Sequence, residues 1–69
     1  MISQRYLLSV IFRDRNVVEI EVSDATRENF TAAFQVGSAS VLGLHDDRNG
    51  LSFYIPRASI MYVSIKALP

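Results

Sequence analysis

The residues best suited to metal binding lie together in the second half of the chain, at His45, Asp46 and Asp47. Imidazole and carboxylate groups are common ligands of divalent cations, and Asp47, Asn49 and Gly50 have the spacing of positions in a calcium-binding loop. At that spacing His45 replaces the first aspartate and Pro56 replaces the bidentate glutamate, so the calcium site fails. Aspartate and asparagine are also what tight turns require. We therefore interpret the segment as a polar hairpin tip and expect no metal.

Anion binding is the chemistry that the arginines suggest. Arg13 and Arg15 lie in a short polar segment between two apolar runs, and Arg57 lies in another such segment. Guanidinium groups bind phosphate and carboxylate groups through paired hydrogen bonds. The fold that we expect brings the three arginines to one end of a sheet, beside the small-residue segment around Ser38. We therefore predict a ligand site at Arg13, Arg15, Arg57 and Ser38, with loop charges paired to Asp14 as the alternative.

No set of residues typical of an enzyme stands out. The chain has one histidine and no cysteine, and no serine lies at a recognisable motif spacing from His45. Glu19 and Glu21 share one face of a predicted strand, an arrangement that would suit the paired carboxylates of a glycosidase. Solvated charges that discourage strand-to-strand aggregation are the simpler interpretation of this pair. We expect no enzymatic activity and no cofactor.

The composition bounds the class of protein. The chain has 69 residues, 49% of them hydrophobic, with seven Lys and Arg against seven Asp and Glu. A domain of this length buries only about 60% of its unfolded surface, and without cysteine it has no disulfide, so we expect oligomerisation to add stability. The balanced charge argues against a non-specific nucleic-acid binder. No signal-peptide pattern and no long apolar run are present, so we expect a cytoplasmic protein without a membrane partner.

The elements that position these residues follow from the apolar patterning. Strict alternation over 17–23 predicts a half-solvated strand, and Ser23 or Asp24 is suited to cap a helix that Gly37 ends. The Asn49-Gly50 pair is a strong hairpin signal. We predict strands over 6–12, 17–23, 40–45, 51–55 and 60–65, and a helix over about 25–36.

The order of these elements decides the topology. The order ββαβββ resembles the ubiquitin-like β-grasp, in which the last strand runs parallel to the first. The link at 56–59 has only four residues, and a parallel partner for the first strand would need a crossover of about a dozen or more. We therefore predict a single α+β domain over 1–69. It has a five-stranded, largely antiparallel sheet with one helix packed on one face, and curling at Pro56 into a partial barrel is an open alternative.

The predicted sheet has more apolar surface than one helix covers, because the apolar stripe of the predicted helix is thin. In the first strand Leu7 and Ile11 lie on one side, while Leu8, Val10 and Phe12 lie on the other. One set faces the helix and the other needs a second cover, so we expect self-association, with closure into a small barrel as the alternative. Tyr54 and Tyr62 either fill a partner's pocket or pack across strands. The predicted interface residues are Leu7, Ile11, Tyr54, Met61, Tyr62 and Val63.

The C-terminal half reads Leu42-Gly-Leu44-His-Asp46, then Gly50, Pro56, and Ile60 to Ile65. It resembles a family of small uncharacterised proteins, mainly from actinobacteria, with the tail L-x-L-x-D, Gly, Pro and I-x-Y-V-x-I. The resemblance implies a fold and no active site. Some members carry an ATP-binding label, but this chain has no glycine-rich phosphate loop, so we do not transfer that activity. Residues 55–60 also resemble, more weakly, a motif of Sm-like RNA-binding proteins.

From these features we expect a non-catalytic protein-interaction module that forms a homodimer or higher oligomer. Its main partner is a second copy of itself, and another protein is the one further partner considered. Two alternatives stay open. The first is an anion, nucleotide or RNA binder that uses the end formed by Arg13, Arg15 and Arg57. The second is a small protein inhibitor of a larger protein, such as a phage antagonist or an antitoxin.

Overall fold

The N-terminal hairpin forms where the sequence alternates. In the computed structural model, which describes residues 4–37 and 39–69, β1 (Arg5–Phe12) pairs antiparallel with β2 (Val17–Ser23). The turn closes through a hydrogen bond of 2.9 Å from the Arg15 amide to the Phe12 carbonyl. Arg15 has a φ of 74°, the left-handed conformation that glycine usually supplies in such turns.

The helix α1 (Asp24–Val36) begins and ends where the sequence predicts. The Ser23 hydroxyl accepts a hydrogen bond of 3.3 Å from the Thr26 amide and so caps the N-terminus. Gly37 ends the helix with a φ of 76°. Phe30 is the helix residue that is fully buried, which confirms that the apolar stripe is thin.

The second hairpin joins β3 (Val41–Asp46) to β4 (Leu51–Pro56). Gly50 adopts a φ of 65° in its turn, as the Asn-Gly signal predicts. A short 3-10 turn, η1 (Arg57–Ser59), follows Pro56 and leads into β5 (Ile60–Ala67). Proline lacks an amide donor and belongs at a strand end, which is where Pro56 lies.

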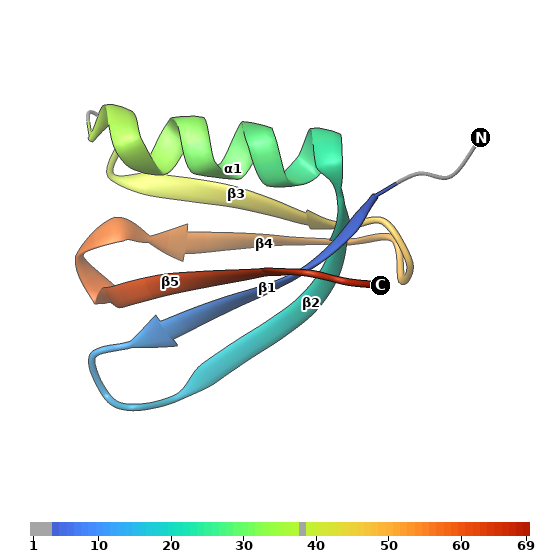
Figure 1. The fold of residues 1–69 in the computed structure, drawn as a ribbon. Coiled ribbons are helices and arrows are strands. Elements are labelled where there is room, and N and C mark those ends of the chain that lie inside the picture. Colours follow the sequence, from blue (N-terminus) through green and yellow to red (C-terminus); the bar gives the residue numbers. More distant parts are fainter. Residues whose placement is uncertain (1–3, 38) are drawn as a thin grey trace.

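The five strands divide between two sheets. One has the order β2-β1-β5 and the other contains β3 and β4 (Figure 1). All three pairings are antiparallel, including β5 with β1, so the topology predicted from the short link is confirmed along with the α+β class. The predicted single sheet is in fact two, and the strands described here form no closed barrel. The helix lies between β2 and β3 in the chain, and β4 and β5 are not paired, so among the described residues no strand pairing joins the two sheets.

One core lies between the two sheets and the helix. Leu8 and Val10 of β1 are fully buried, and they belong to the same cluster as Phe30 of α1 and Leu42 and Leu44 of β3. The second sheet and the helix therefore cover the same face of the first sheet, the face that carries Leu8 and Val10. Leu7 and Ile11 face away from this core and are half-buried. The second sheet therefore does not supply the cover expected on the outer face, which carries Leu7 and Ile11.

Candidate functional site

Three segments that carry the predicted site meet at one end of the molecule. The β1–β2 turn, the turn between β4 and β5, and the C-terminal end of α1 lie together at the left of Figure 1. The β3–β4 turn, the start of β1 and the C-terminus lie toward the opposite end. Arg13 and Arg15 follow β1, and Arg57 begins η1, so the topology brings all three arginines to this end.

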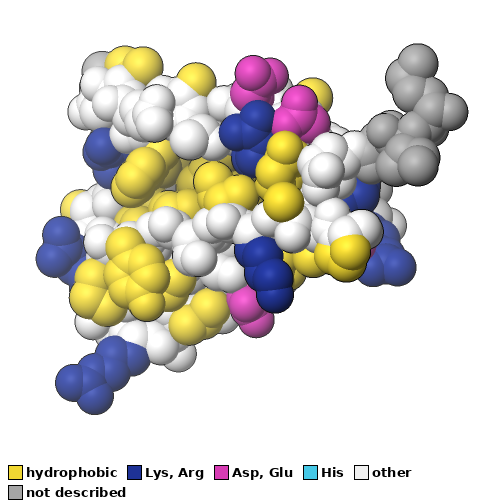
Figure 2. All heavy atoms as spheres, viewed as in Figure 1, with side chains coloured by type: hydrophobic (Ala, Val, Ile, Leu, Met, Phe, Trp, Pro, Cys, Tyr) yellow, Lys and Arg dark blue, Asp and Glu magenta, His cyan; other side chains and the backbone are white. Residues whose placement is uncertain are grey.

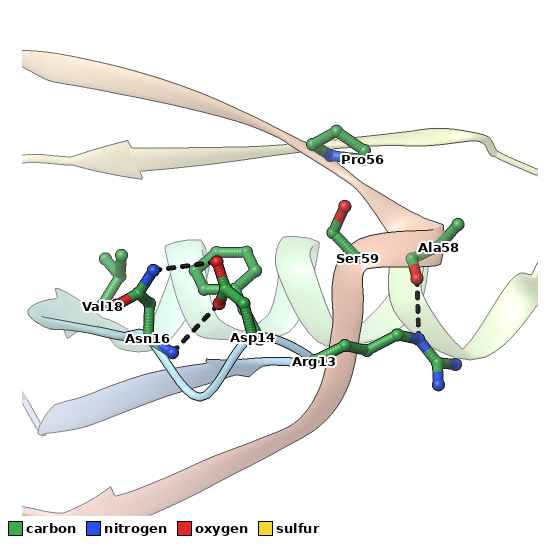
Figure 3. A pocket seen from close by; sticks show the side chains of 8 residues that line it. Arg13, Asp14, Asn16, Val18, Pro56, Ala58 and Ser59 are labelled. Atoms are coloured by element: carbon green, nitrogen blue, oxygen red, sulfur yellow. Dashed lines mark hydrogen bonds between the residues drawn. The ribbon is translucent and has the colours of Figure 1, made fainter.

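Arg13 is fixed by hydrogen bonds at two points. Its Nε donates to the Ala58 carbonyl at 2.8 Å, and its backbone amide donates to the Ser59 carbonyl at 2.9 Å. Figure 3 shows the Arg13 side chain extended toward Ala58, beside a cavity of about 610 Å³ between the two turns. The Asp14 carboxylate lies in the same cavity wall, where it accepts hydrogen bonds from Asn16. Asp14 therefore does not neutralise Arg13, contrary to the alternative considered from sequence.

Arg57 is held against the end of the helix. Its guanidinium carbon lies 4.8 Å from the centroid of the Phe34 ring, a cation–π arrangement, and its backbone amide donates to the Ser40 carbonyl at 2.9 Å. The Nη1 atom is buried and has no hydrogen-bond partner in the part of the chain that the structure describes. A second cavity, of about 540 Å³, is lined by Arg13 and Arg57 together with Phe34, Gly37 and Ser40.

The remaining two predicted site residues do not complete this cavity. Arg15 is exposed in the β1–β2 turn and does not line either cavity beside Arg13. Ser38 lies outside the described residues. The structure therefore brings together Arg13 and Arg57, and it adds Phe34, which was not among the predicted site residues.

The arginines fall into two groups by their partners. Arg5 and Arg48 lie 3.7 and 3.2 Å from the carboxylate of Glu21, and Arg27 lies 2.8 Å from Asp24. Among the described residues, no carboxylate lies within ion-pair distance of the three arginines at the opposite end, Arg13, Arg15 and Arg57. The chain is neutral overall, but its charge is therefore segregated.

The β3–β4 hairpin tip is built around Asp46. This side chain is buried, and it accepts hydrogen bonds from Asn49 Nδ2 at 2.8 Å and from the Arg48 amide at 3.1 Å. The Asn49 side-chain bond above all, helped by the Asn49 and Arg48 amides, holds the pKa of Asp46 below its ordinary value. His45 points to the other face, where Nε2 lies 3.5 Å from Asp47 and Nδ1 lies 3.1 Å from the Ser52 hydroxyl. Within the described residues, no three His, Asp or Glu side chains gather as metal ligands would.

The predicted interface residues do not share one surface. Ile11 pairs with Val17 on one side and with Tyr62 on the other, so these three side chains form an apolar row across the outer face of the first sheet. Val17 and Tyr62 are about half exposed, at 52% and 53%. Leu7 lies further along this face, between Glu21 and Lys66. Val17 was not among the predicted interface residues, although its place at the start of an alternating strand was a usable signal.

The other predicted interface residues lie on β4 and along β5. Tyr54 is 76% exposed on the outer face of β4, and Met61 is 50% exposed on β5. Tyr54 and Tyr62 belong to different sheets, so they do not pack across a strand pair. Val63 is half-buried and packs against the core.

A groove separates α1 from β5. It has a volume of about 230 Å³ and is lined by Phe30 and Phe34 of the helix and by Val63 and Ile65 of β5. The helix packs mainly on β3 and approaches β5 less closely. Figure 2 shows hydrophobic side chains gathered on this face below the helix. Ile65 stays 38% exposed although it lies on the same face of the sheet as the buried Leu8, its partner on β1.

No helix among the described residues has the length and apolar character that crossing a membrane demands. Comparison with protein-family models, with curated proteins and with solved structures finds no match for this chain. The resemblances to the actinobacterial family and to Sm-like proteins stay predictions.

Proposed function

We propose that this chain is a non-catalytic protein-interaction module that self-associates along the free edge of β5. The observation that supports the proposal is that this edge has no paired strand. Among the described strands β5 pairs with β1 alone, so one side of an eight-residue strand has no backbone partner. Unpaired edges of this length are sites where another strand adds, unless charges, prolines or covering elements block them.

The protection of the β5 edge is weak. Between Ile60 and Ile65 the strand carries no charge and no proline, and Lys66 is its one charged residue. The helix does not cover this side of β5 closely, because the groove between them, lined by Phe34 and Ile65, is open. Apolar side chains therefore flank the unpaired backbone on both faces, with Tyr62 outside and Ile65 inside.

A second copy of β5 fits this edge better than an unrelated strand because β5 is self-complementary. In an antiparallel pairing centred on Ser64, Val63 would face Ile65 of the second copy on the core side. Tyr62 would face Lys66 of the second copy on the outer side, which permits a cation–π contact. The two lysines are not opposite one another, so the pairing has no like-charge repulsion. Each contact occurs twice by symmetry, as in most homodimers.

The molar mass in solution tests this proposal. Sedimentation equilibrium between about 10 μM and about 1 mM should show a concentration-dependent rise from 7.7 kDa toward twice that mass. Hydrogen exchange at β5 amides should slow over the same concentration range as the fraction of dimer increases. A chain that stays monomeric throughout this range would overturn the proposal. A dimer in which β5 amides exchange at unchanged rates would overturn the assignment of the edge.

A further inference from the structure

A cavity at the arginine end has the features of an anion site. It lies between the end of α1, the β4–β5 turn and the end of β1, and has a volume of about 540 Å³. Two guanidinium groups, of Arg13 and Arg57, line it from different elements. Volumes of this size are typical of sites for small organic ligands.

Both guanidinium groups are positioned before any ligand arrives. Stacking on the Phe34 ring holds the Arg57 head group, and the hydrogen bond from Nε to the Ala58 carbonyl orients that of Arg13. That bond uses Nε alone, and no described acceptor is bonded to the terminal nitrogens of Arg13. Fixed guanidinium groups lose less conformational freedom when they bind an oxyanion.

Arg57 has a buried donor without a hydrogen-bond partner among the described residues. Its Nη1 atom is buried without an acceptor in the described part of the chain, and such a donor is costly to leave unsatisfied. The Phe34 ring face attracts the positive charge but is a poor substitute for a hydrogen-bond acceptor. Arg57 lines the cavity, so an oxyanion bound there would give its guanidinium group a hydrogen-bond acceptor.

The local charge sets the kind of anion. Arg13, Arg15 and Arg57 against Asp14 leave an excess of two positive charges at this end. The C-terminal end of a helix carries the equivalent of about half a negative charge, and α1 ends here at Gly37, so the end stays positive by about one and a half charges. A phosphate monoester, with about −1.5 to −2 charges at neutral pH, matches this excess better than a carboxylate.

We propose that the cavity lined by Arg13 and Arg57 binds the phosphate group of a small phosphorylated compound. The two guanidinium groups donate to the phosphate oxygens. Phe34 and Ile60, which form an apolar part of the wall, contact the organic part of the ligand.

Nuclear magnetic resonance titration at constant ionic strength tests the site, with inorganic phosphate, uridine monophosphate and acetate as probes. Phosphate and the mononucleotide should cause saturable shifts at the Arg13 and Arg57 Nε–H groups and at the Gly37 amide. Arg13→Gln, which keeps a donor for the Ala58 carbonyl, should weaken binding at least about tenfold. Arg57→Lys should weaken it similarly, because lysine keeps the charge and loses the planar pair of donors. Thermal melting of each variant checks its fold.

Arg15→Ala is the matched control, because Arg15 lies at the same end with the same charge but does not line the cavity. It should change the affinity by less than about twofold. An equal loss of affinity in Arg15→Ala and Arg13→Gln would show that only the general positive charge of this end attracts the anion, and it would overturn the site. So would the absence of saturable shifts at about 20 mM phosphate, or acetate binding as tightly as phosphate. Binding of a single-stranded RNA through the same arginines, without binding of the mononucleotide, would overturn the small-ligand assignment.

Discussion

The guanidinium of Arg57 lies 4.8 Å from the centre of the Phe34 ring, so a residue of the β4–β5 turn closes over the last turn of the helix. The two residues are 23 positions apart in the chain and belong to segments that share no strand pairing. A positive charge at a helix C-terminus is also favourable to the helix dipole. This contact therefore attaches α1 to the rest of the fold at its C-terminal end, as the Ser23 cap does at its start.

Phe34→Leu should lower the free energy of unfolding by about 1 kcal/mol, because it removes the ring from Arg57 and part of an apolar contact. Urea denaturation of Phe34→Leu, Arg57→Met and the double variant measures the coupling between the two residues. We expect a coupling of about 0.5 kcal/mol or more. Additive effects of the two substitutions would contradict the cation–π contact.

Gly37→Ala should destabilise the chain by about 1 kcal/mol, because Gly37 has a φ of 76° and a side chain is strained in that conformation. The added Cβ would meet Arg57 Nη2 at an ordinary contact distance of 3.6 Å, so the backbone and not crowding causes the loss. Gly43→Ala is the control, since Gly43 lacks a positive φ and a Cβ there meets nothing within 4 Å. Gly43→Ala should shift stability by less than about 0.5 kcal/mol. Equal effects in the two variants would refute this account of the helix end.

Asp46 should make stability depend on pH in the acid range. Its pKa in the folded chain lies below the unfolded value of about 3.9, so its carboxylate stabilises the fold above that value. This contribution is lost as the pH falls through the folded pKa. Asp46→Asn should therefore be less stable than the native chain at pH 7, with the difference shrinking below about pH 4. Urea midpoints across this range measure the effect, and a difference that is constant with pH would be evidence against it.

Ile65→Lys should prevent self-association, because it places a charge on the core side of the β5 edge where the second copy would pack. The dissociation constant of the dimer should rise at least about tenfold. Val17→Lys is the control, since Val17 is an equally apolar, exposed residue on β2, away from β5. Sedimentation equilibrium of both variants gives the comparison. If Val17→Lys dissociates the dimer and Ile65→Lys does not, the outer row of the sheet is the interface instead.

Local signals account for the elements that were predicted well. The alternation over 17–23, the capping serine at Ser23 and the glycine at Gly37 act within a few residues of themselves, so the boundaries of β2 and α1 follow from them. The short link after Pro56 likewise excludes a parallel crossover, and β5 is antiparallel to β1. The three arginines were placed at one end by the same directional argument.

Other features depend on contacts between distant segments, for which the sequence carries no short-range signal. Whether the strands form one sheet or two depends on whether β4 and β5 exchange hydrogen bonds. A single sheet requires this pairing, but the two strands are joined through η1 and do not pair. The pairing of Arg57 with Phe34, and the exclusion of Arg15 from the cavity, depend on side-chain directions that only the packed chain establishes.

The order ββαβββ, the helix ends, the turns and the antiparallel sense of the last strand follow from the amino-acid sequence alone, because backbone propensity and link length act locally. Three further features follow only from packing: the second hairpin covers the first sheet, Arg13 and Arg57 share a cavity, and β5 is left with an open edge. These outcomes depend on how the layers pack, since burial of Leu8, Phe30 and Leu42 in one core fixes which strand edges and which guanidinium groups stay at the surface.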